Sequence, residues 1–245
     1  MSLTTKRQIK ACAFDLGNSL INDTRLSRDA TVDMGDWLLR NSIIQSSETF
    51  TATYERINHG TRKPFISHTF GEIDFFEKTF QELAVKGLSA EAALKKYREI
   101  LLEKIQPDPD IVNAFHLLRR KNIQIALLSN ERACRVDAYM EKTGLSPFFD
   151  TIIVSERIGI EKPDLRFFQE ALRRLNISAE ELVMFGDNEI ADGACKQLGI
   201  FFVLVTAYKN KGWVWEDGSP FPPDHIMKKI TPAEMEAFLD TFLLK

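Results

Sequence analysis

The sequence predicts an α/β fold in which a doubly wound parallel sheet forms the core and an α-helical cap domain is inserted. Five short runs of apolar, β-branched or aromatic residues alternate with segments whose apolar residues recur at helical spacing. This alternation stops between about Asn22 and Gln106, where only helical patterns occur. The length of 245 residues agrees, because domains of roughly 100–200 residues leave room for one core and one sizeable insertion.

The predicted strands are short and strongly apolar. The middle three lack strict alternation of polar and apolar residues, which is typical of strands that are covered on both faces. In chain order the five predicted strands are Ile9–Leu16, Ile123–Leu128, Thr151–Val154, Leu182–Phe185 and Ile200–Val205.

The predicted core helices lie between and after these strands. Thr231 and Glu234 have the spacing of a capping box, and Pro232 stands at the first helical position, so a final helix is expected to run to about Leu244. Trp213–Pro223, which is rich in Gly, Pro and Trp, is predicted to be a loop. The other core helices are predicted from apolar residues at helical spacing: Ile111, Ala114, Phe115 and Leu118, then Val136, Met140 and Leu145, then Phe167, Phe168, Ala171, Leu172 and Leu175.

The inserted stretch is predicted to be a helical cap. Ser89 has the sequence context of a helix start, and Pro107 and Pro109 end the helical region before the core resumes. We therefore assign residues 1–21 and 107–245 to the α/β core and residues 22–106 to the cap. Apolar side chains line one face of each of two cap helices, Ile73, Phe76, Phe80 and Leu83 in one and Leu94, Tyr97, Leu101 and Ile105 in the other.

Composition and charge exclude several classes of protein. The chain is 44% hydrophobic and 27% charged, with a net charge of −3, which gives no reason to expect a nucleic acid or a membrane as partner. No apolar run approaches the length of a membrane-spanning helix, and the N-terminus lacks the apolar segment of a signal peptide. Cys12, Cys134 and Cys195 have no metal-binding spacing and are expected to be buried thiols in a reducing compartment. We therefore expect a cytoplasmic protein.

Polar residues that can handle a phosphoryl group follow four of the predicted strands. Asp15 lies at the end of the first strand, Ser129 and Asn130 follow the second, Lys162 the third, and Asp187 the fourth. In an open α/β sheet, ligands bind beyond the carboxyl ends of the strands, so these residues are expected to meet at one edge. Two carboxylates can hold Mg²⁺, an aspartate can act as nucleophile, and a lysine and a hydroxyl can neutralise phosphoryl oxygens.

Over nearly its whole length the chain resembles the haloacid dehalogenase-like hydrolase superfamily, whose members have a Rossmann-like core. The specific matches are the segments Ser-Glu-x-x-Gly-x-x-Lys-Pro-Asp, which begins at Ser155, and Gly-Asp-Asn-x-x-x-x-Asp, which begins at Gly186. The resemblance implies hydrolysis of a small phosphorylated molecule through an aspartyl-phosphate. The roles that it implies are Asp15 as nucleophile, Lys162 as the cation that orients and neutralises phosphate, Ser129 as phosphate ligand, and Asp15, Gly17, Asp187 and Asp192 around Mg²⁺. Asn18 and Asn130 are candidates for substrate contact, with turn formation as the alternative.

Gly17 departs from the pattern of most phosphatases of this superfamily, which have a second aspartate there as general acid and base. The family's metal contact at this position is a backbone carbonyl, which glycine keeps, so Mg²⁺ binding is expected to survive. The proton donor for the leaving group is lost, and such catalysis is worth about 10²–10⁴ in rate. Some members with Asp-x-Gly resemble active sugar-phosphate phosphatases.

Two alternatives to a Mg²⁺-dependent phosphatase stay open from the sequence. A metal-independent 2-haloacid dehalogenase would also lack the second aspartate, but Asp187 beside Asp15 without a cation would raise the pKa of one carboxylate and blunt the nucleophile. The other alternative is a phosphate-binding protein without turnover, which is suggested by the absence of the second aspartate at Gly17. The sequence does not indicate an oligomeric state or which cap residues face the site.

Overall fold

The computed structural model describes residues 8–61, 72–209 and 219–242. It divides into two compact units, one of residues Met1–Asp23 with Gln106–Lys245 and the other of Thr24–Ile105. We call them the core unit and the helical unit.

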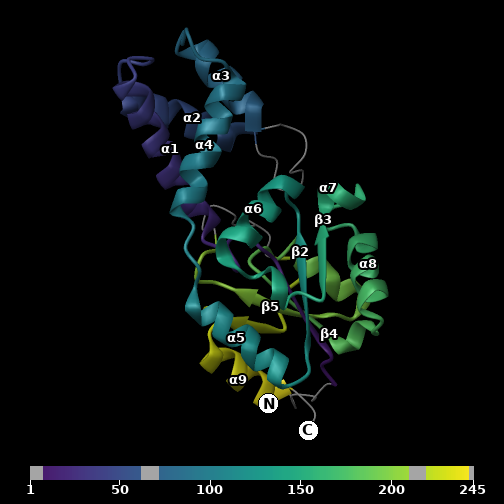
Figure 1. Cartoon of the computed structure of the whole chain (residues 1–245). Helices are drawn as coiled ribbons and strands as arrows, with labels where there is room; N and C mark the ends of the chain where they lie inside the picture. The colour runs from purple at the N-terminus through teal and green to yellow at the C-terminus, as the bar shows by residue number, and fades with distance from the viewer. Residues whose placement is uncertain (1–7, 62–71, 210–218, 243–245) are drawn as a thin grey trace. The chain divides into compact units, whose positions relative to one another are not determined.

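The core unit contains one sheet of six parallel strands in the order β3-β2-β1-β4-β5-β6 (Figure 1). The predicted α/β class with a doubly wound parallel sheet is confirmed. All five predicted strands are present, and β6 is an addition: it has three residues and begins two residues after a Pro-Pro pair, so it carries no periodicity to detect. The strands are β1 (Ala11–Phe14), β2 (Gln124–Ser129), β3 (Thr151–Val154), β4 (Leu182–Gly186), β5 (Phe201–Val205) and β6 (His225–Met227).

The register aligns the carboxyl ends of the central strands. Phe14, the last residue of β1, pairs with Leu127 of β2 and with Phe185 of β4. The residues that follow β1 and β4, Asp15 and Asp187, therefore leave the sheet at the same edge.

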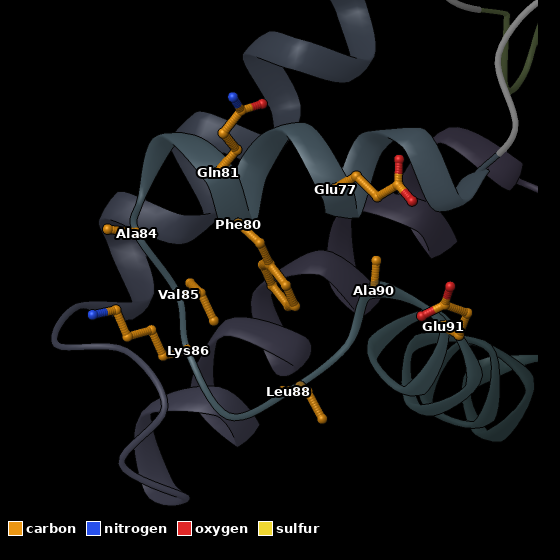
Figure 2. A pocket seen from close by; sticks show the side chains of 9 residues that line it. All are labelled: Glu77, Phe80, Gln81, Ala84, Val85, Lys86, Leu88, Ala90 and Glu91. Carbon is orange, nitrogen blue, oxygen red and sulfur yellow. The ribbon is translucent and has the colours of Figure 1, made fainter.

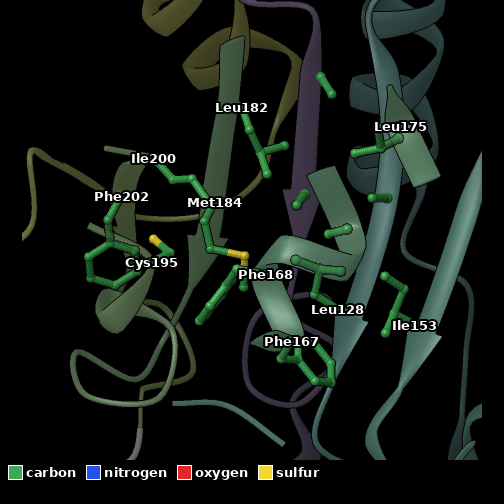
Figure 3. Close-up of a cluster of buried hydrophobic side chains, with 14 of the residues drawn as sticks. Leu128, Ile153, Phe167, Phe168, Leu175, Leu182, Met184, Cys195, Ile200 and Phe202 are labelled. Atoms are coloured by element: carbon green, nitrogen blue, oxygen red, sulfur yellow. The ribbon is translucent and has the colours of Figure 1, made fainter. Parts of the chain in front are cut away.

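Helices cover the sheet on both faces. On one face α8 packs against Ala13, Met184 and Leu128, with its Phe167 and Phe168 completely buried (Figure 3). The alternate residues of the strands face the other way. The helices of the core unit are α5 (Pro109–Arg120), α6 (Ala133–Thr143), α7 (Ser155–Ile158), α8 (Leu165–Leu175) and α9 (Pro232–Phe242), with short 3-10 segments at Ser146–Phe148, Ala179–Glu181 and Gly193–Leu198.

The second face of the sheet carries several aromatic rings in contact with one another. The rings of Phe14 and Phe185 stack with centroids 4.9 Å apart. Phe14 contacts Phe115 of α5 at 5.0 Å, and Phe185 contacts Phe238 of α9 at 5.4 Å. The side-chain period of two in each strand thus gives both faces of the sheet a mixture of aliphatic and aromatic side chains.

Local signals set the helix ends, with one difference from expectation. Asp108 caps α5 by accepting a hydrogen bond from the N–H of Asp110, with Pro109 in the first turn. Thr231 accepts from the N–H of Glu234, as a capping box requires, but Glu234 accepts from the N–H of Lys228 at 2.8 Å instead of from that of Thr231. The carboxylate therefore ties the start of α9 to the end of β6. The last residue described in this helix is Phe242.

The helical unit packs around an aromatic cluster. Tyr54 lies 5.0 Å from Phe76 and 5.9 Å from Tyr97 between ring centroids, and all three are buried. Ser89 caps α4 by accepting from the N–H of Ala92 at 3.2 Å, as its sequence context predicts. The described part of this unit consists of α1 (Asp23–Arg40, whose first residue belongs to the core unit), α2 (Ser47–Thr61), α3 (Glu72–Glu82) and α4 (Ala90–Lys104).

Two of the three cysteines match the expectation of buried thiols. Cys12 and Cys195 are buried free thiols, but Cys134 is exposed, because the buried face of α6 is formed by Val136, Tyr139, Met140 and Thr143. None of the described helices has the length and hydropathy that a membrane crossing requires. Most of the predicted loop Trp213–Pro223 lies outside the described residues, and its described part, 219–223, contains no helix or strand.

Candidate active site

Lys162 stands at the centre of a buried cluster at the carboxyl edge of the sheet. Its Nζ donates to Oδ1 of Asp15 at 2.7 Å, to Oδ1 of Asp192 at 2.6 Å and to the carbonyl oxygen of Leu128 at 2.8 Å. These acceptors use all three protons of the ammonium group. The side chain is only 2% exposed, so Lys162 is fixed in position by buried charge-assisted hydrogen bonds.

The cluster holds more negative than positive charge. Oxygen atoms of Asp15, Asp187 and Asp192 all lie within 4.8 Å of one another, and one lysine faces these three carboxylates. Burial raises the pKa of Asp15 to about 7, although the charge of Lys162 lowers it, and Asp192 raises it further. Burial, followed by the charges of Asp15 and Asp192, also raises the pKa of Asp187 well above its ordinary value.

The surplus of buried carboxylate oxygen makes this a donor set for a hard divalent cation. Mg²⁺ takes oxygen ligands, commonly one or two carboxylates with the rest supplied by water or phosphate. A cation here would offset the two negative charges that Lys162 leaves uncompensated. The residues present therefore fit a magnesium ion.

Asp192 is held by contacts on both of its oxygens. Oδ1 accepts from Lys162, and Oδ2 accepts from the N–H of Asn188 at 3.1 Å. Its side chain does not cap the 3-10 segment that follows. Gly186 makes the arrangement possible, because a Cβ atom there would lie 2.1 Å from Oδ2 of Asp192. Asn188 in turn shapes the loop by accepting from the N–H groups of Ile190 and Ala191.

The segment around Lys162 is anchored by Asn130, which follows the second strand, and by residues of its own motif. Asn130 accepts from the N–H of Lys162 at 2.8 Å and donates to its carbonyl at 2.6 Å. Glu156 accepts from the N–H of Ala133 at the start of α6, and Asp164 caps α8. Glu156 and Asp164 thus have structural contacts that account for their places in the motif, while the side chain of Lys162 reaches the carboxylates.

The remaining predicted residues also lie near strand ends. Ser129 is the last residue of β2 and is 2% exposed. Gly17 and Asn18 lie in the turn after β1, where Gly17 bridges to Ile21 and the N–H of Asn18 donates to the carbonyl of Ile21. Asn18 has a φ of 54°, a left-handed conformation that asparagine tolerates. The structure thus brings Asp15, Lys162, Asp187 and Asp192 together, and it uses the side chain of Asn130 to position Lys162.

Sequence reasoning missed the Leu128 carbonyl, Asn188 and Gly186. A backbone carbonyl leaves no signal in a sequence. Asn188 and Gly186 stand inside the recognised Gly-Asp-Asn segment, but their roles depend on a carboxylate four residues beyond Asn188. That dependence is visible only in three dimensions.

A pocket of about 390 Å³ lies elsewhere, between the end of α3 and the start of α4 (Figure 2). Phe80, Val85 and Leu88 give it an apolar lining, with Glu77 and Glu91 nearby. It contains none of the strand-end carboxylates, so it is distinct from the cluster around Lys162.

Comparison with known proteins agrees with this geometry. The family profile of haloacid dehalogenase-like hydrolases matches residues 9–199. A glyceraldehyde 3-phosphate phosphatase of Methanocaldococcus jannaschii is 28% identical over 135 residues, which are 55% of this chain and 59% of that protein. The chain spans about half the length of the curated archaeal phosphatases that it matches first.

Solved structures share the fold. A HAD phosphatase from Thermococcus onnurineus superposes with a TM-score of 0.66 at 20% identity, over 96% of this chain and 100% of that one. A 2-haloacid dehalogenase from Pseudomonas syringae pv. Tomato DC3000 superposes with a TM-score of 0.62 at 21% identity, over 94% of this chain and 100% of that one. Because a phosphatase and a dehalogenase fit about equally well, the fold alone does not choose between the two reactions.

Proposed function

The chain belongs to the haloacid dehalogenase-like hydrolase family, and from this membership and the buried carboxylate cluster we propose that it is a Mg²⁺-dependent hydrolase of small phosphomonoesters. The observation that carries the proposal is the surplus of carboxylates around Lys162. A single nucleophilic aspartate paired with a lysine needs no further acid, whereas three carboxylates within 4.8 Å suit a cation and a phosphoryl group.

In the proposed reaction Asp15 is the nucleophile. One of its carboxylate oxygens bonds to phosphorus while the bond from phosphorus to the leaving oxygen breaks, and water then displaces the carboxylate to release phosphate. Lys162 holds Asp15 in place through Oδ1 and puts its positive charge beside the phosphoryl oxygens. Asp192 and the Leu128 carbonyl fix Lys162, so the ammonium needs no reorganisation during the reaction.

Asp15, Asp187 and the backbone carbonyl of Gly17 would hold the magnesium ion, with Asp192 in support. When bound, Mg²⁺ supplies positive charge that lowers the repulsion between the nucleophile and an anionic substrate. Ser129, at the end of the neighbouring strand, would donate its hydroxyl to a phosphoryl oxygen. Asn18 is proposed to contact the substrate from the turn after β1.

The substrate class that we propose is a small phosphorylated sugar or triose. The support is the M. jannaschii relative, named as a glyceraldehyde 3-phosphate phosphatase. The helical unit, which follows the turn that carries Gly17 and Asn18 in the sequence, is proposed to be a cap domain.

The test is phosphate release from an aryl phosphate and a panel of triose, pentose and nucleoside phosphates, with Mg²⁺ or with a chelator. We expect Mg²⁺-dependent release that Asp15→Asn lowers by about 10⁴-fold or more, the scale seen when a catalytic nucleophile is removed. Asp240→Asn on the exposed face of α9 is the matched control and is expected to keep full activity. Equal activity of wild type and Asp15→Asn would refute the proposal.

Dehalogenation is the competing outcome of the same experiment, favoured by Gly17. It would show as chloride release from a 2-chloroacid that a chelator does not affect. Binding of phosphorylated ligands without any release would instead favour a member that has lost turnover.

A further inference from the structure

Asp23 lies beside the position at which the first motif lacks its second aspartate. A Cβ atom built on Gly17 would lie 3.8 Å from the Cβ of Asp23, an ordinary van der Waals contact. The turn after β1 causes this proximity, because Gly17 bridges to Ile21 and the N–H of Asp23 donates to the carbonyl of Ile21 at 2.8 Å. The two side chains would therefore start from neighbouring points in the core unit.

The carboxylate of Asp23 is held in place by α6. Its Oδ1 accepts from a guanidinium nitrogen of Arg135 at 2.5 Å and from the hydroxyl of Tyr139 at 3.1 Å. Arg135 also donates to the Tyr139 oxygen at 3.0 Å, and Glu131 approaches the same guanidinium at 3.4 Å. Burial, followed by the charge of Asp23, raises the pKa of Tyr139, which keeps its hydroxyl protonated as a donor.

This arrangement leaves one oxygen of Asp23 for chemistry. The two hydrogen bonds described for its side chain both end on Oδ1, among the residues that the structure covers. The side chains of Asp23 and Arg135 are only 17% and 13% exposed, so the carboxylate is rigid and partly shielded from water. A residue that served only to start α1 would need no partly buried arginine and buried tyrosine from another helix.

We propose that Asp23 performs the proton transfers that the missing carboxylate at position 17 would have performed. The proposal rests on the phosphatase function proposed above. In the first half-reaction Oδ2 of Asp23, as a carboxylic acid, gives its proton to the leaving oxygen as the bond between that oxygen and phosphorus breaks. In the second, the Asp23 carboxylate takes a proton from the water that attacks phosphorus, and the bonding electrons return to Asp15. The proton gained is the one given in the next turnover, so the cycle balances.

The test uses substitutions at both positions and two kinds of substrate. Asp23→Asn is expected to lower kcat for an alkyl phosphate by about 10²–10⁴-fold. With an aryl phosphate, whose leaving group needs no proton, it should release one equivalent of phenolate per enzyme in a burst and then turn over slowly, because only the water step lacks its base. Gly17→Asp together with Asp23→Asn should recover at least tenfold of the lost rate.

Gly17→Asp alone keeps the proposal testable if Asp23→Asn does not fold. A Cβ atom at position 17 would make only an ordinary van der Waals contact with Asp23, so the new side chain can be placed, and we expect no rise in kcat because the proton-transfer role is already filled. Gly17→Asn is the matched control for the added bulk. A rise of 10²-fold or more in Gly17→Asp would show that wild type lacks the group, and would overturn the proposal.

The outcomes separate this inference from the proposed function. If wild type releases phosphate but Asp23→Asn does so equally well, or loses activity without a burst and without recovery by Gly17→Asp, Asp23 has a structural role only and this inference is wrong. If wild type and every variant release no phosphate from either substrate in Mg²⁺, the proposed function fails and this inference fails with it.

Discussion

The carboxyl edge of the sheet and the layer between the sheet and α8 are two buried regions of the core unit that follow opposite rules. At the edge, the ammonium group of Lys162 contacts two of three clustered carboxylates. In the layer, Ala13, Met184 and Phe168 are completely buried among other apolar side chains (Figure 3). Burial of charge costs folding free energy, whereas burial of apolar surface supplies it.

The difference separates the residues that should govern activity from those that should govern stability. The raised pKa values of Asp15 and Asp187 show that the fold does not fully compensate their charge. Uncompensated buried charge of this kind is typical of functional sites. A bound cation that neutralises the carboxylates should therefore stabilise the folded protein. Changes in the α8 layer, in contrast, should alter the free energy of unfolding and leave the activity of each folded molecule intact.

Lys162→Met should give the largest effect, because it removes the only cation described in the edge cluster and leaves three carboxylates together. Removing one partner of a buried ion pair costs about 3–5 kcal/mol, so we expect a loss of this size in the free energy of unfolding, together with loss of phosphatase activity. Urea unfolding followed by circular dichroism measures the first and phosphate release the second.

The double variant Lys162→Met/Asp192→Asn is the control for that prediction. It returns the charge of the cluster to its wild-type value, so it should recover part of the stability and none of the activity. A double variant no more stable than the single one would mean that the carboxylates do not repel one another as the comparison assumes.

Leu175→Ala, in the apolar layer, should lower the free energy of unfolding without lowering activity. Leu175 is 4% exposed at the far end of α8, in the apolar cluster. Truncation of a buried leucine costs about 2–5 kcal/mol, with activity per folded molecule unchanged. Leu172→Ala, on the same helix but only partly buried, should cost less. Equal losses from the two variants, or a lower kcat for Leu175→Ala at a temperature where it is folded, would contradict the division between the two regions.

The same two regions differ in how much the sequence predicts. The apolar runs predict all five longer strands, and apolar residues at helical spacing predict α5, α6 and α8, because burial imposes a strong pattern. Helix α9 is predicted from its capping residues. The strand ends predict that Asp15, Lys162 and Asp187 meet, because parallel strands deliver their carboxyl ends to one edge. Asp192 is expected there only from the family resemblance. The roles of these residues stay predictions until activity is measured.

The parts that the sequence did not predict depend on contacts between distant residues. Asp23 and Arg135 are 112 positions apart, and neither belongs to a recognised motif. The side chain of Asn130 contacts the backbone of Lys162, which is 32 positions away. The sequence shows only a polar residue at a strand end, for which substrate contact is an equally good interpretation. Strand β6 has three residues, too few for a pattern to be detected.

Magnesium should stabilise the edge region and leave the α8 layer unaffected. A ligand that binds only the folded protein stabilises it by about 2.7 kcal/mol at 100 times its Kd, so Tm should rise with Mg²⁺ concentration. Asp187→Asn should abolish most of this rise, whereas Leu175→Ala should lower Tm but keep the rise. Scanning calorimetry with Mg²⁺ and with a chelator measures both. An equal rise in Asp187→Asn and in wild type would place the ion outside the cluster.

Substitution of His225 should give the smallest change in stability. Its titratable ring lies against the aromatic rings of α9. Its ring lies 5.5 Å from that of Phe238 and 5.3 Å from that of Phe242. Burial lowers the pKa of His225 below its ordinary value, and the charge of Glu234 only partly opposes this. The folded protein therefore binds a proton less readily than the unfolded chain, so stability should fall as the pH drops through the unfolded pKa of about 6.5.

In His225→Gln the loss of stability between pH 7.5 and pH 5.5 should be smaller than in wild type, as measured by urea unfolding at both pH values. If the two proteins lose the same amount of stability, the aromatic rings of α9 do not disfavour the charged form of His225.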